Sequence, residues 1–203
     1  MAVDATSLAR ESDRELARRA AAGDRRAQHD VFAQQKASVH RALFRILGSN
    51  RDVEDIVQDA FIAIFRALPS YRGDSALTRW CLTITTRVAF AYISRRKPAS
   101  VDLALVEEIL PGGLDVQRQV HAREAARRLY AALDRIEPKQ RIAFALAKID
   151  GRTLEEVAEM TESSLFAVKT RVWRARKTLY ARAKKDPVLA PYLGEFAEGG
   201  DDE

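Results

Sequence analysis

The sequence predicts an all-α protein made of two small helical domains joined by a flexible linker, the C-terminal one a helix-turn-helix. Three observations lead to this prediction. Apolar residues recur at intervals of three and four through most of the chain, which is the period of amphipathic helices. Glycine and proline interrupt this pattern at helix ends and over one stretch near the middle. Near the C-terminus, a capping signal, a tight turn and a cationic helix follow one another.

The first helices are bounded by capping residues. Residues 1–12 are short and polar, so we expect them to be frayed. Asp13 is expected to cap a helix that runs through Ala22 and closes at Gly23, and a second helix runs from about Asp24 to Leu47 and ends at Gly48. The residues expected on its buried side are Val31, Phe32, Val39, Leu43, Ile46 and Leu47.

A third helix begins after Ser49 or Asn50, either of which can cap it. Its apolar stripe faces a core and consists of Val53, Ile56, Val57, Ala60, Phe61, Ile64 and Leu68. The first two turns off this stripe carry an acidic cluster, where carboxylates are favoured by the helix dipole. The cluster consists of Asp52, Glu54, Asp55, Gln58 and Asp59.

The acidic cluster has three interpretations. It is a hydrated helix start, as composition alone favours, or a docking face for a basic partner, as a cluster of one sign in an otherwise basic chain suggests. The third interpretation is a divalent-metal site. Against it, the carboxylates lie on consecutive turns with no histidine among them.

A loop and a cationic helix follow. Pro69 stops the third helix, and Gly73 is free to take a positive φ in the loop Ser70–Ser75. The next helical stripe consists of Leu77, Trp80, Ile84, Val88 and Ala91, and its cationic edge of Arg79, Arg87, Arg95, Arg96 and Lys97. Trp80 is either a core residue or a base platform. Tyr71, in the loop, is the better candidate for stacking on an unpaired base.

These segments resemble region two of bacterial RNA polymerase sigma factors of the extracytoplasmic-function group. The resemblance rests on residues 52–61 (DVEDIVQDAF), 71–75 (YRGDS) and 78–80 (TRW). It implies that the acidic face binds the coiled coil of the polymerase β′ subunit, and that the loop and following helix capture unpaired bases of the promoter −10 element. The residues implied in that capture are Tyr71, Arg72, Ser75, Arg79, Trp80 and Arg87.

Two positions in this region depart from the family. Arg87 stands where the family usually has Asn, and Ala91 where it usually has Asp. Because the Asn position lies near the base-reading surface of the family, the −10 bases that this chain accepts do not carry over from it.

Composition agrees with a nucleic-acid partner. The net charge is +5 and the pI about 9.5, which suit an anionic partner, and 47% hydrophobic residues in 203 suffice for modest cores. The single cysteine, Cys81, excludes an internal disulfide framework and is expected to be a buried hydrophobe; the three histidines lack zinc spacing. No apolar run has membrane-spanning length and Met1–Ala5 lacks a signal-peptide core, so a cytoplasmic protein without membrane contact is expected.

The middle of the chain predicts a linker over residues 99–121. Pro98, Pro111, Gly112 and Gly113 interrupt weakly periodic, partly acidic sequence, with a short helix expected at Leu103–Leu110. The resemblance implies that this linker runs toward the active-site and RNA-exit channels of the polymerase.

The helical pattern resumes at Ala122, and its stripe consists of Ala125, Leu129, Ala132, Leu133 and Ile136. Pro138 forces a break before a helix at about Lys139–Ile149, which Gly151 ends. Thr153 and Glu156 form a capping box for a short helix that stops near Thr161. Ser164 then caps a helix whose expected buried stripe is Leu165, Val168, Val172, Ala175 and Leu179.

The outward face of this last helix is cationic and carries Lys169, Thr170, Arg171, Trp173, Arg174, Arg176 and Lys177. It is either a hydrated basic face or a face that enters the major groove of DNA. In the groove, arginines would contact guanine edges or phosphates and an aromatic ring a thymine methyl. The free N–H groups at the helix start would hold a phosphate.

This segment resembles region four of the same family, which reads the −35 element. The resemblance is carried by Ala132-Leu133, Arg141, Gly151-Arg152-Thr153, Glu156-Val157-Ala158, Val168-Lys169-Thr170-Arg171 and Arg174-Ala175-Arg176. It implies −35 contacts from Ser164, Lys169, Thr170, Arg171, Trp173, Arg174 and Lys177. The departures are Glu137 before Pro138, Glu162 at the turn glycine, and Phe166-Ala167 where Gly-Thr is common. The preferred −35 bases therefore do not carry over either.

The predicted organisation is a region-two-like domain at 1–98, the linker, a region-four-like domain at 122–186, and an acidic tail at 187–203 whose apolar part, Val188–Leu193, is expected to dock. The resemblance implies a transcription initiation factor that binds core RNA polymerase through the β′ coiled coil and the β flap, recognises promoter DNA and meets an anti-sigma factor. It implies no catalytic residue, metal or cofactor. The alternatives are a stand-alone DNA-binding regulator or sigma mimic that does not engage polymerase and, more remotely, a metal-dependent nuclease.

Overall fold

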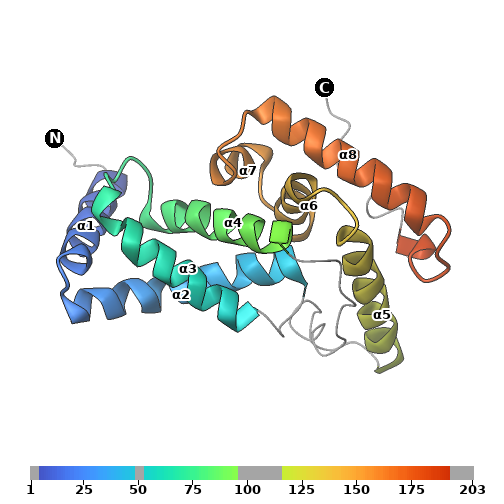
Figure 1. Cartoon of the computed structure of the whole chain (residues 1–203), viewed down its shortest axis with the longest axis horizontal. Helices are drawn as coiled ribbons and strands as arrows, with labels where there is room; N and C mark the ends of the chain where they lie inside the picture. The colour runs from blue at the N-terminus through green and yellow to red at the C-terminus, as the bar shows by residue number, and fades with distance from the viewer. Residues whose placement is uncertain (1–4, 49–52, 96–115, 193–203) are drawn as a thin grey trace.

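A computed structural model describes residues 5–48, 53–95 and 116–192 (Figure 1). Within these ranges every regular element is helical, which confirms the predicted all-α class. No helix in the described part of the chain is long and apolar enough to cross a lipid bilayer. The expected cap at Ser49 or Asn50 and the expected linker helix Leu103–Leu110 lie outside the described residues.

The N-terminal half contains α1 (Ala5–Ala21), α2 (Arg25–Leu47), α3 (Val53–Ala67), the short 3₁₀ turn η1 (Leu68–Ser70) and α4 (Leu77–Arg95). The predicted bounds of α2 are confirmed, because the Asp24 side chain accepts the backbone N–H groups of Arg26 and Ala27 and Gly48 ends the helix with a φ of 67°. Phe32, which was expected inside, is 36% exposed at the edge of the core, where its ring lies 4.6 Å from that of Phe61.

The predicted start of α1 was wrong. The helix begins at Ala5, so residues 5–12 are helical, and Asp13 lies within it. The Asp13 carboxylate instead accepts the backbone N–H of Leu77 at 2.8 Å, so it caps the start of α4. A local reading assigned Asp13 to its own helix because nothing in the sequence near residue 13 points to a partner 64 positions away.

The C-terminal half contains α5 (Val116–Leu133), α6 (Pro138–Phe144), the π-helical turn η2 (Ala145–Ile149), α7 (Leu154–Met160), α8 (Leu165–Ala183) and η3 (Ala190–Tyr192). α5 begins at Val116 rather than at Ala122. Pro138 is the first residue of α6, where its missing N–H costs nothing. Glu137, one of the departures from the family, caps α6 by accepting the N–H groups of Lys139 and Gln140.

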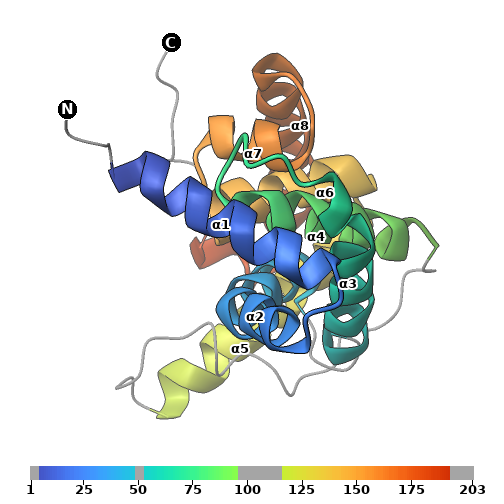
Figure 2. The same ribbon diagram turned by 90° about the vertical axis from the view of Figure 1, so that its left-hand side faces the viewer.

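The two halves share one hydrophobic core. α4 lies between α2 and α3 on one side and α6 and α7 on the other (Figures 1 and 2). Both sides of α4 are therefore buried, and its buried residues are Leu77, Cys81, Leu82, Ile84, Thr85, Thr86 and Ala89. Of the predicted stripe, Leu77 and Ile84 are buried, whereas Trp80, Val88 and Ala91 are only half-buried. The prediction allowed for one packing partner, but α4 packs on two sides.

Arg141 of α6 joins the halves most directly. Its side chain is 3% exposed, and its guanidinium donates to the backbone carbonyls of Ile46 and Leu47, each at 3.1 Å, and to the Asp134 carboxylate. The last carbonyls of a helix have no partner within that helix. Arg141 therefore caps the C-terminal end of α2 from the other half of the chain.

Tyr130 of α5 contacts the same end of α2. Its hydroxyl donates to the Arg45 carbonyl at 2.9 Å, and burial raises the pKa of this phenol. A Cβ atom at Gly48 would lie 2.1 Å from the Tyr130 ring. Gly48 is thus required both by its positive φ and by the close approach of α5.

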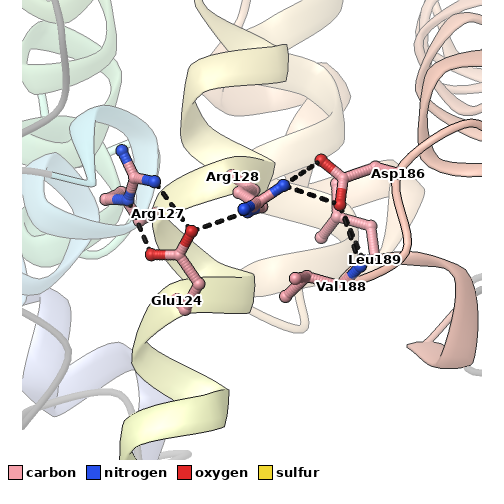
Figure 3. Close-up of polar contacts among 6 residues, drawn as sticks. All are labelled: Glu124, Arg127, Arg128, Asp186, Val188 and Leu189. Carbon is pink, nitrogen blue, oxygen red and sulfur yellow. Dashed lines mark hydrogen bonds and ion pairs between the residues drawn. The ribbon is translucent and has the colours of Figure 1, made fainter.

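The apolar start of the tail docks, as expected, and its place is against α5 and the end of α8. Leu189 is buried with Ala125 and Ala183. Arg128 holds this segment by donating to both oxygens of Asp186 at 3.0 Å and to Glu124 at 2.6 Å, as Figure 3 shows. Hydrogen bonds from Arg127 and Arg128 lower the pKa of Glu124 to about 2. Residues 193–203 lie outside the described part of the chain.

Candidate nucleic-acid and protein interfaces

The acidic face of α3 is open to solvent. Val53, Ile56 and the rest of the predicted stripe are buried, which turns Glu54, Asp55, Gln58 and Asp59 outward as exposed side chains. Glu54 also lies 3.4 Å from His40 of α2. Asp52 lies outside the described residues. The exposed carboxylates share one side of one helix and give that side a negative charge.

The described residues offer no alternative metal site on this face. Within residues 5–48, 53–95 and 116–192 there is no group of three or more histidine, cysteine or carboxylate side chains that could hold a metal ion.

The loop Ser70–Ser75 is fixed by contacts rather than left open. The Tyr71 hydroxyl donates to the Ser75 carbonyl at 2.7 Å, and its half-buried ring lies 5.3 Å from Trp80. Burial raises the pKa of Tyr71 to about 12. The Arg72 side chain is exposed, while its carbonyl accepts from Arg14 of α1 at 2.7 Å. In this arrangement the Arg72 side chain is free to meet a ligand, whereas the Tyr71 ring is partly covered by Trp80.

Two cations of α4 are bound by carboxylates of the other half. Arg79 donates to Glu159 of α7 at 2.5 Å. Arg87 forms a bidentate pair with Glu162, the Nε atom donating at 2.8 Å. These four side chains are about half exposed, so the pairs lie at the rim of the contact between α4 and α7. Arg79 and Arg87 were both expected to contact DNA. In the structure their guanidinium groups are instead paired with Glu159 and Glu162 of the same chain.

A cavity of about 280 Å³ lies beside the Arg87–Glu162 pair, between α4 and the α7–α8 turn. Phe90, Ile142 and Met160 give it an apolar wall, while Arg87, Lys139 and Arg171 give it cationic groups. It belongs to the same contact between the two halves.

The helix-turn-helix is built as predicted. Thr153 and Glu156 form the capping box of α7, with hydrogen bonds of 3.0 and 3.2 Å. Ser164 caps α8 by accepting the Ala167 N–H at 3.2 Å. Glu162, where the family has glycine, has a φ of 49°, which is uncommon for a residue with a side chain. The turn thus keeps the glycine-like backbone although its residue is glutamate.

The outward face of α8 is exposed and cationic. Lys169, Arg174 and Lys177 are exposed, and Trp173 is 57% exposed with the Lys177 ammonium 5.1 Å from its ring centroid. The Thr170 hydroxyl donates to the Phe166 carbonyl at 2.9 Å, so its proton is used within the helix. α8 contains no acidic residue. This face has the charge and the aromatic ring that a major groove of DNA can accept.

Two residues of α8 differ from expectation. Arg171 is half-buried and donates to the Ser163 hydroxyl at 2.6 Å. It therefore lines the cavity between α4 and the α7–α8 turn and does not lie on the exposed face of α8. Leu165, expected in the buried stripe, is 37% exposed. The other four predicted members, Val168, Val172, Ala175 and Leu179, are buried.

Phe166 of α8 was not among the predicted site residues. It is 80% exposed beside the start of α8, where the family usually has glycine. The available signal was an aromatic residue that lies off the apolar stripe of its helix.

Comparison with known proteins agrees with this geometry. Residues 31–98 match the protein family described as Sigma-70 region 2, and residues 126–179 match Sigma-70, region 4. The chain is 30% identical over 177 residues to the ECF RNA polymerase sigma-E factor of Escherichia coli strain K12. The aligned segment covers 83% of this chain and 92% of that protein. The chain is 26% identical over 197 residues to the RNA polymerase sigma-H factor of Pseudomonas aeruginosa, covering 93% and 99%.

Solved structures share the fold. The structure of CnrH in complex with the cytosolic domain of CnrY superposes with a TM-score of 0.59 at 26% identity, covering 86% of this chain and 98% of CnrH. The sigma factor RpoE of Bartonella quintana, solved with the anti-sigma factor NepR, has a TM-score of 0.50 at 20% identity, covering 76% and 95%, which bears on the fold alone.

Proposed function

The chain belongs to the extracytoplasmic-function group of the sigma-70 family of RNA polymerase sigma factors, and from this membership we propose how its surfaces divide the work of transcription initiation. The observation that carries the proposal is the presence, in one chain, of a region-two match and a region-four match, with the acidic face of α3 and the cationic face of α8 both exposed. The acidic face of α3 docks on the polymerase, α8 binds upstream promoter DNA, and α4 with the loop before it captures melted DNA. The chain itself performs no bond chemistry.

Docking uses the exposed acidic side chains of α3. Glu54, Asp55 and Asp59 lie on one side of a helix whose other side is anchored in the core. Such a rigid, one-signed face suits a basic coiled coil of the polymerase β′ subunit, because charge complementarity speeds encounter and fixes orientation.

Upstream recognition uses α8. Lys169, Arg174 and Lys177 supply groups for guanine edges and phosphates, and Trp173 supplies an apolar surface for a thymine methyl. Ser164 caps the helix start, where the remaining N–H groups favour a phosphate. This face is exposed while the two halves of the chain are in contact.

Downstream capture needs a change of arrangement. Arg79 and Arg87 must exchange Glu159 and Glu162 for nucleic acid before they can hold a melted strand. We therefore expect α7 to separate from α4 when the chain loads on polymerase. The loop keeps its own contacts, in which Arg14 holds Arg72, Trp80 packs on Tyr71, and Tyr71 holds Ser75. A partner protein that binds the closed arrangement, in which α7 packs on α4, would keep the factor inactive. CnrH was solved in complex with the cytosolic domain of CnrY, and RpoE with the anti-sigma factor NepR.

Run-off transcription with bacterial core RNA polymerase over a library of random upstream and downstream elements tests the proposal. Enrichment of two spaced elements that depends on this chain is the expected result. Binding to core enzyme in a pull-down separates the proposal from a stand-alone DNA-binding regulator. Failure to bind core, with DNA binding retained, would favour that alternative.

A further inference from the structure

Phe166 is a large apolar side chain that the fold leaves in water. It is 80% exposed, more than any other large apolar residue in the described part of the chain. Burying a phenylalanine is favourable in proportion to the area removed from water. Since the fold leaves most of this side chain uncovered, a partner that covers it gains that contact.

The neighbours of Phe166 indicate what that partner is. Phe166, Thr170, Trp173 and Lys177 follow one another at intervals of four, three and four, so they lie on one stripe of α8. The helix carries six lysine and arginine residues and no carboxylate. A protein groove built for an apolar ring would gain little from this charge, whereas DNA matches it, so the stripe is complementary to nucleic acid.

Phenylalanine has no hydrogen-bonding group, which limits what it can recognise on a base edge. In the major groove the apolar feature of a base pair is the C5-methyl group of thymine. Phe166 and Trp173 are seven residues apart, or roughly 10 Å along the helix. That length corresponds to about three base pairs at 3.4 Å each.

We propose that Phe166 contacts the 5-methyl group of a thymine in the upstream promoter element, about three base pairs from the base that Trp173 contacts. The proposal rests on the proposed function of α8. It makes Phe166 a specificity-determining residue at a position where the family commonly has glycine. Promoters of this factor should then require one thymine methyl group. Relatives with glycine at this position have no side chain there to contact that methyl group.

The test replaces single thymines by deoxyuridine, which pairs identically but lacks the methyl group. Holoenzyme is formed from bacterial core polymerase and the full chain. The probe is an upstream duplex that this holoenzyme enriches from a library of random upstream elements. Each thymine of that duplex is replaced in turn, and holoenzyme affinity is measured. For the parent, two positions about three base pairs apart lose affinity by about fourfold each, the equivalent of one buried methyl.

Phe166→Ala loses the deoxyuridine effect at one of those positions and keeps it at the other, while Trp173→Ala does the reverse. Phe166→Leu, which keeps an apolar side chain, retains part of the effect. Leu165→Ala is the matched control, since Leu165 is also exposed but lies off the stripe. It should leave both effects unchanged.

Four outcomes would contradict the inference. Equal weakening of every duplex by Phe166→Ala, with no change in the deoxyuridine pattern, means that the ring contacts the DNA backbone. Weaker binding of Phe166→Ala to core polymerase without DNA means that it contacts protein. If no upstream sequence is enriched at all, the proposed function fails and the inference with it, whereas an enriched element with a flat response overturns the inference alone.

Discussion

Arg87 of α4 and Glu162 of the turn before α8 form a bidentate ion pair, and both residues stand where the family usually has something else. Arginine replaces an asparagine, and glutamate replaces the turn glycine. Each departure alone removes a family feature, but together they create a contact between the two halves of the chain. Glu162 also keeps a left-handed backbone, which costs a residue with a side chain roughly 1–2 kcal/mol.

The first prediction is that this pair biases the chain toward the closed arrangement. Because both side chains are more than half exposed, the pair contributes about 0–1 kcal/mol, equivalent to at most about a fivefold change in the ratio of open to closed molecules. Arg87→Glu should raise the open fraction, and the double variant Arg87→Glu with Glu162→Arg should restore the parent value. Energy transfer between dyes on cysteines introduced at the exposed positions Arg66 and Glu155 measures the change.

Glu162→Gln and Glu162→Gly separate the charge from the backbone. Both lose the carboxylate, but only glycine also relieves the positive φ, so the glycine variant should unfold at a higher temperature than the glutamine variant. Equal energy transfer in the parent and all charge variants would show that the apolar contact alone sets the arrangement.

The second prediction concerns Arg141. Replacing it with methionine keeps the bulk but leaves the Asp134 carboxylate and the carbonyls of Ile46 and Leu47 without their donor. Removing one partner of a buried pair typically costs about 3–5 kcal/mol. Urea unfolding should show a loss of this order, and Arg135→Met, at an exposed neighbour, should lie near the parent. A loss below 1 kcal/mol would mean that the end of α2 is satisfied in another way.

Local signals were sufficient to predict much of this fold. The bounds of α2, the capping box of Thr153 and Glu156 and the Ser164 cap each depend on residues within a few positions of one another. They could be predicted because each side chain satisfies backbone groups of its own helix end. The stripe of α3 is equally local, and it places the acidic face outward as expected.

Long-range pairs could not be predicted in the same way. The caps supplied by Asp13 to α4 and by Arg141 to α2 join positions 64 and 95 residues apart. The inward turn of Arg171 likewise depends on the contact between α4 and the α7–α8 turn. These contacts follow from how the halves pack, which the periodicity of a single helix does not contain.

The third prediction tests docking. Reversing Asp55 and Asp59 to lysine leaves the buried stripe of α3 intact, so the protein should keep its helical content while losing affinity for core polymerase through like-charge contact. Gln58→Lys adds one positive charge without removing a carboxylate and should have a smaller effect. Core binding is measured by titration at two salt concentrations, because the loss should shrink at high salt. Parent-like binding of the folded double variant would exclude this face.

The fourth prediction distinguishes two arginines of α8. Arg174→Ala should weaken binding to the enriched upstream duplex by roughly 1–3 kcal/mol if Arg174 contacts a base edge, or reduce the salt dependence if it contacts a phosphate. Arg171→Ala should weaken DNA binding less, because Arg171 donates to Ser163 at the cavity between α4 and the α7–α8 turn. Fluorescence anisotropy across salt concentrations measures both. An equal loss for the two variants would mean that Arg171 turns outward when DNA binds.

The last prediction concerns pH and the docked tail. Hydrogen bonds from Arg127 and Arg128 lower the pKa of Glu124 from 4.5 to about 2, so its charged form is favoured in the folded protein. Burial alone would raise the pKa of Asp186, but the hydrogen bonds from Arg128 and from the backbone N–H groups of Val188 and Leu189 together lower it below its usual value. A carboxylate with a lowered pKa stabilises the fold above its unfolded pKa, and this contribution is lost as pH falls through the folded value. The contribution of Glu124 is therefore complete above about pH 5 and gone near pH 2.

Glu124→Gln isolates this effect from the other carboxylates of the chain. The melting temperature of the parent should exceed that of the variant by a constant amount above pH 5, and the difference should shrink as the pH is lowered toward 2. Glu155→Gln, at an exposed position of α7, serves as the matched control and should show a smaller difference. Hydrogen exchange at Val188 and Leu189, whose N–H groups the Asp186 carboxylate accepts, should quicken as the pH falls through the lowered pKa of Asp186, after correction for the intrinsic rate. A pH-independent difference in melting temperature would show that Glu124 acts through packing rather than through its charge.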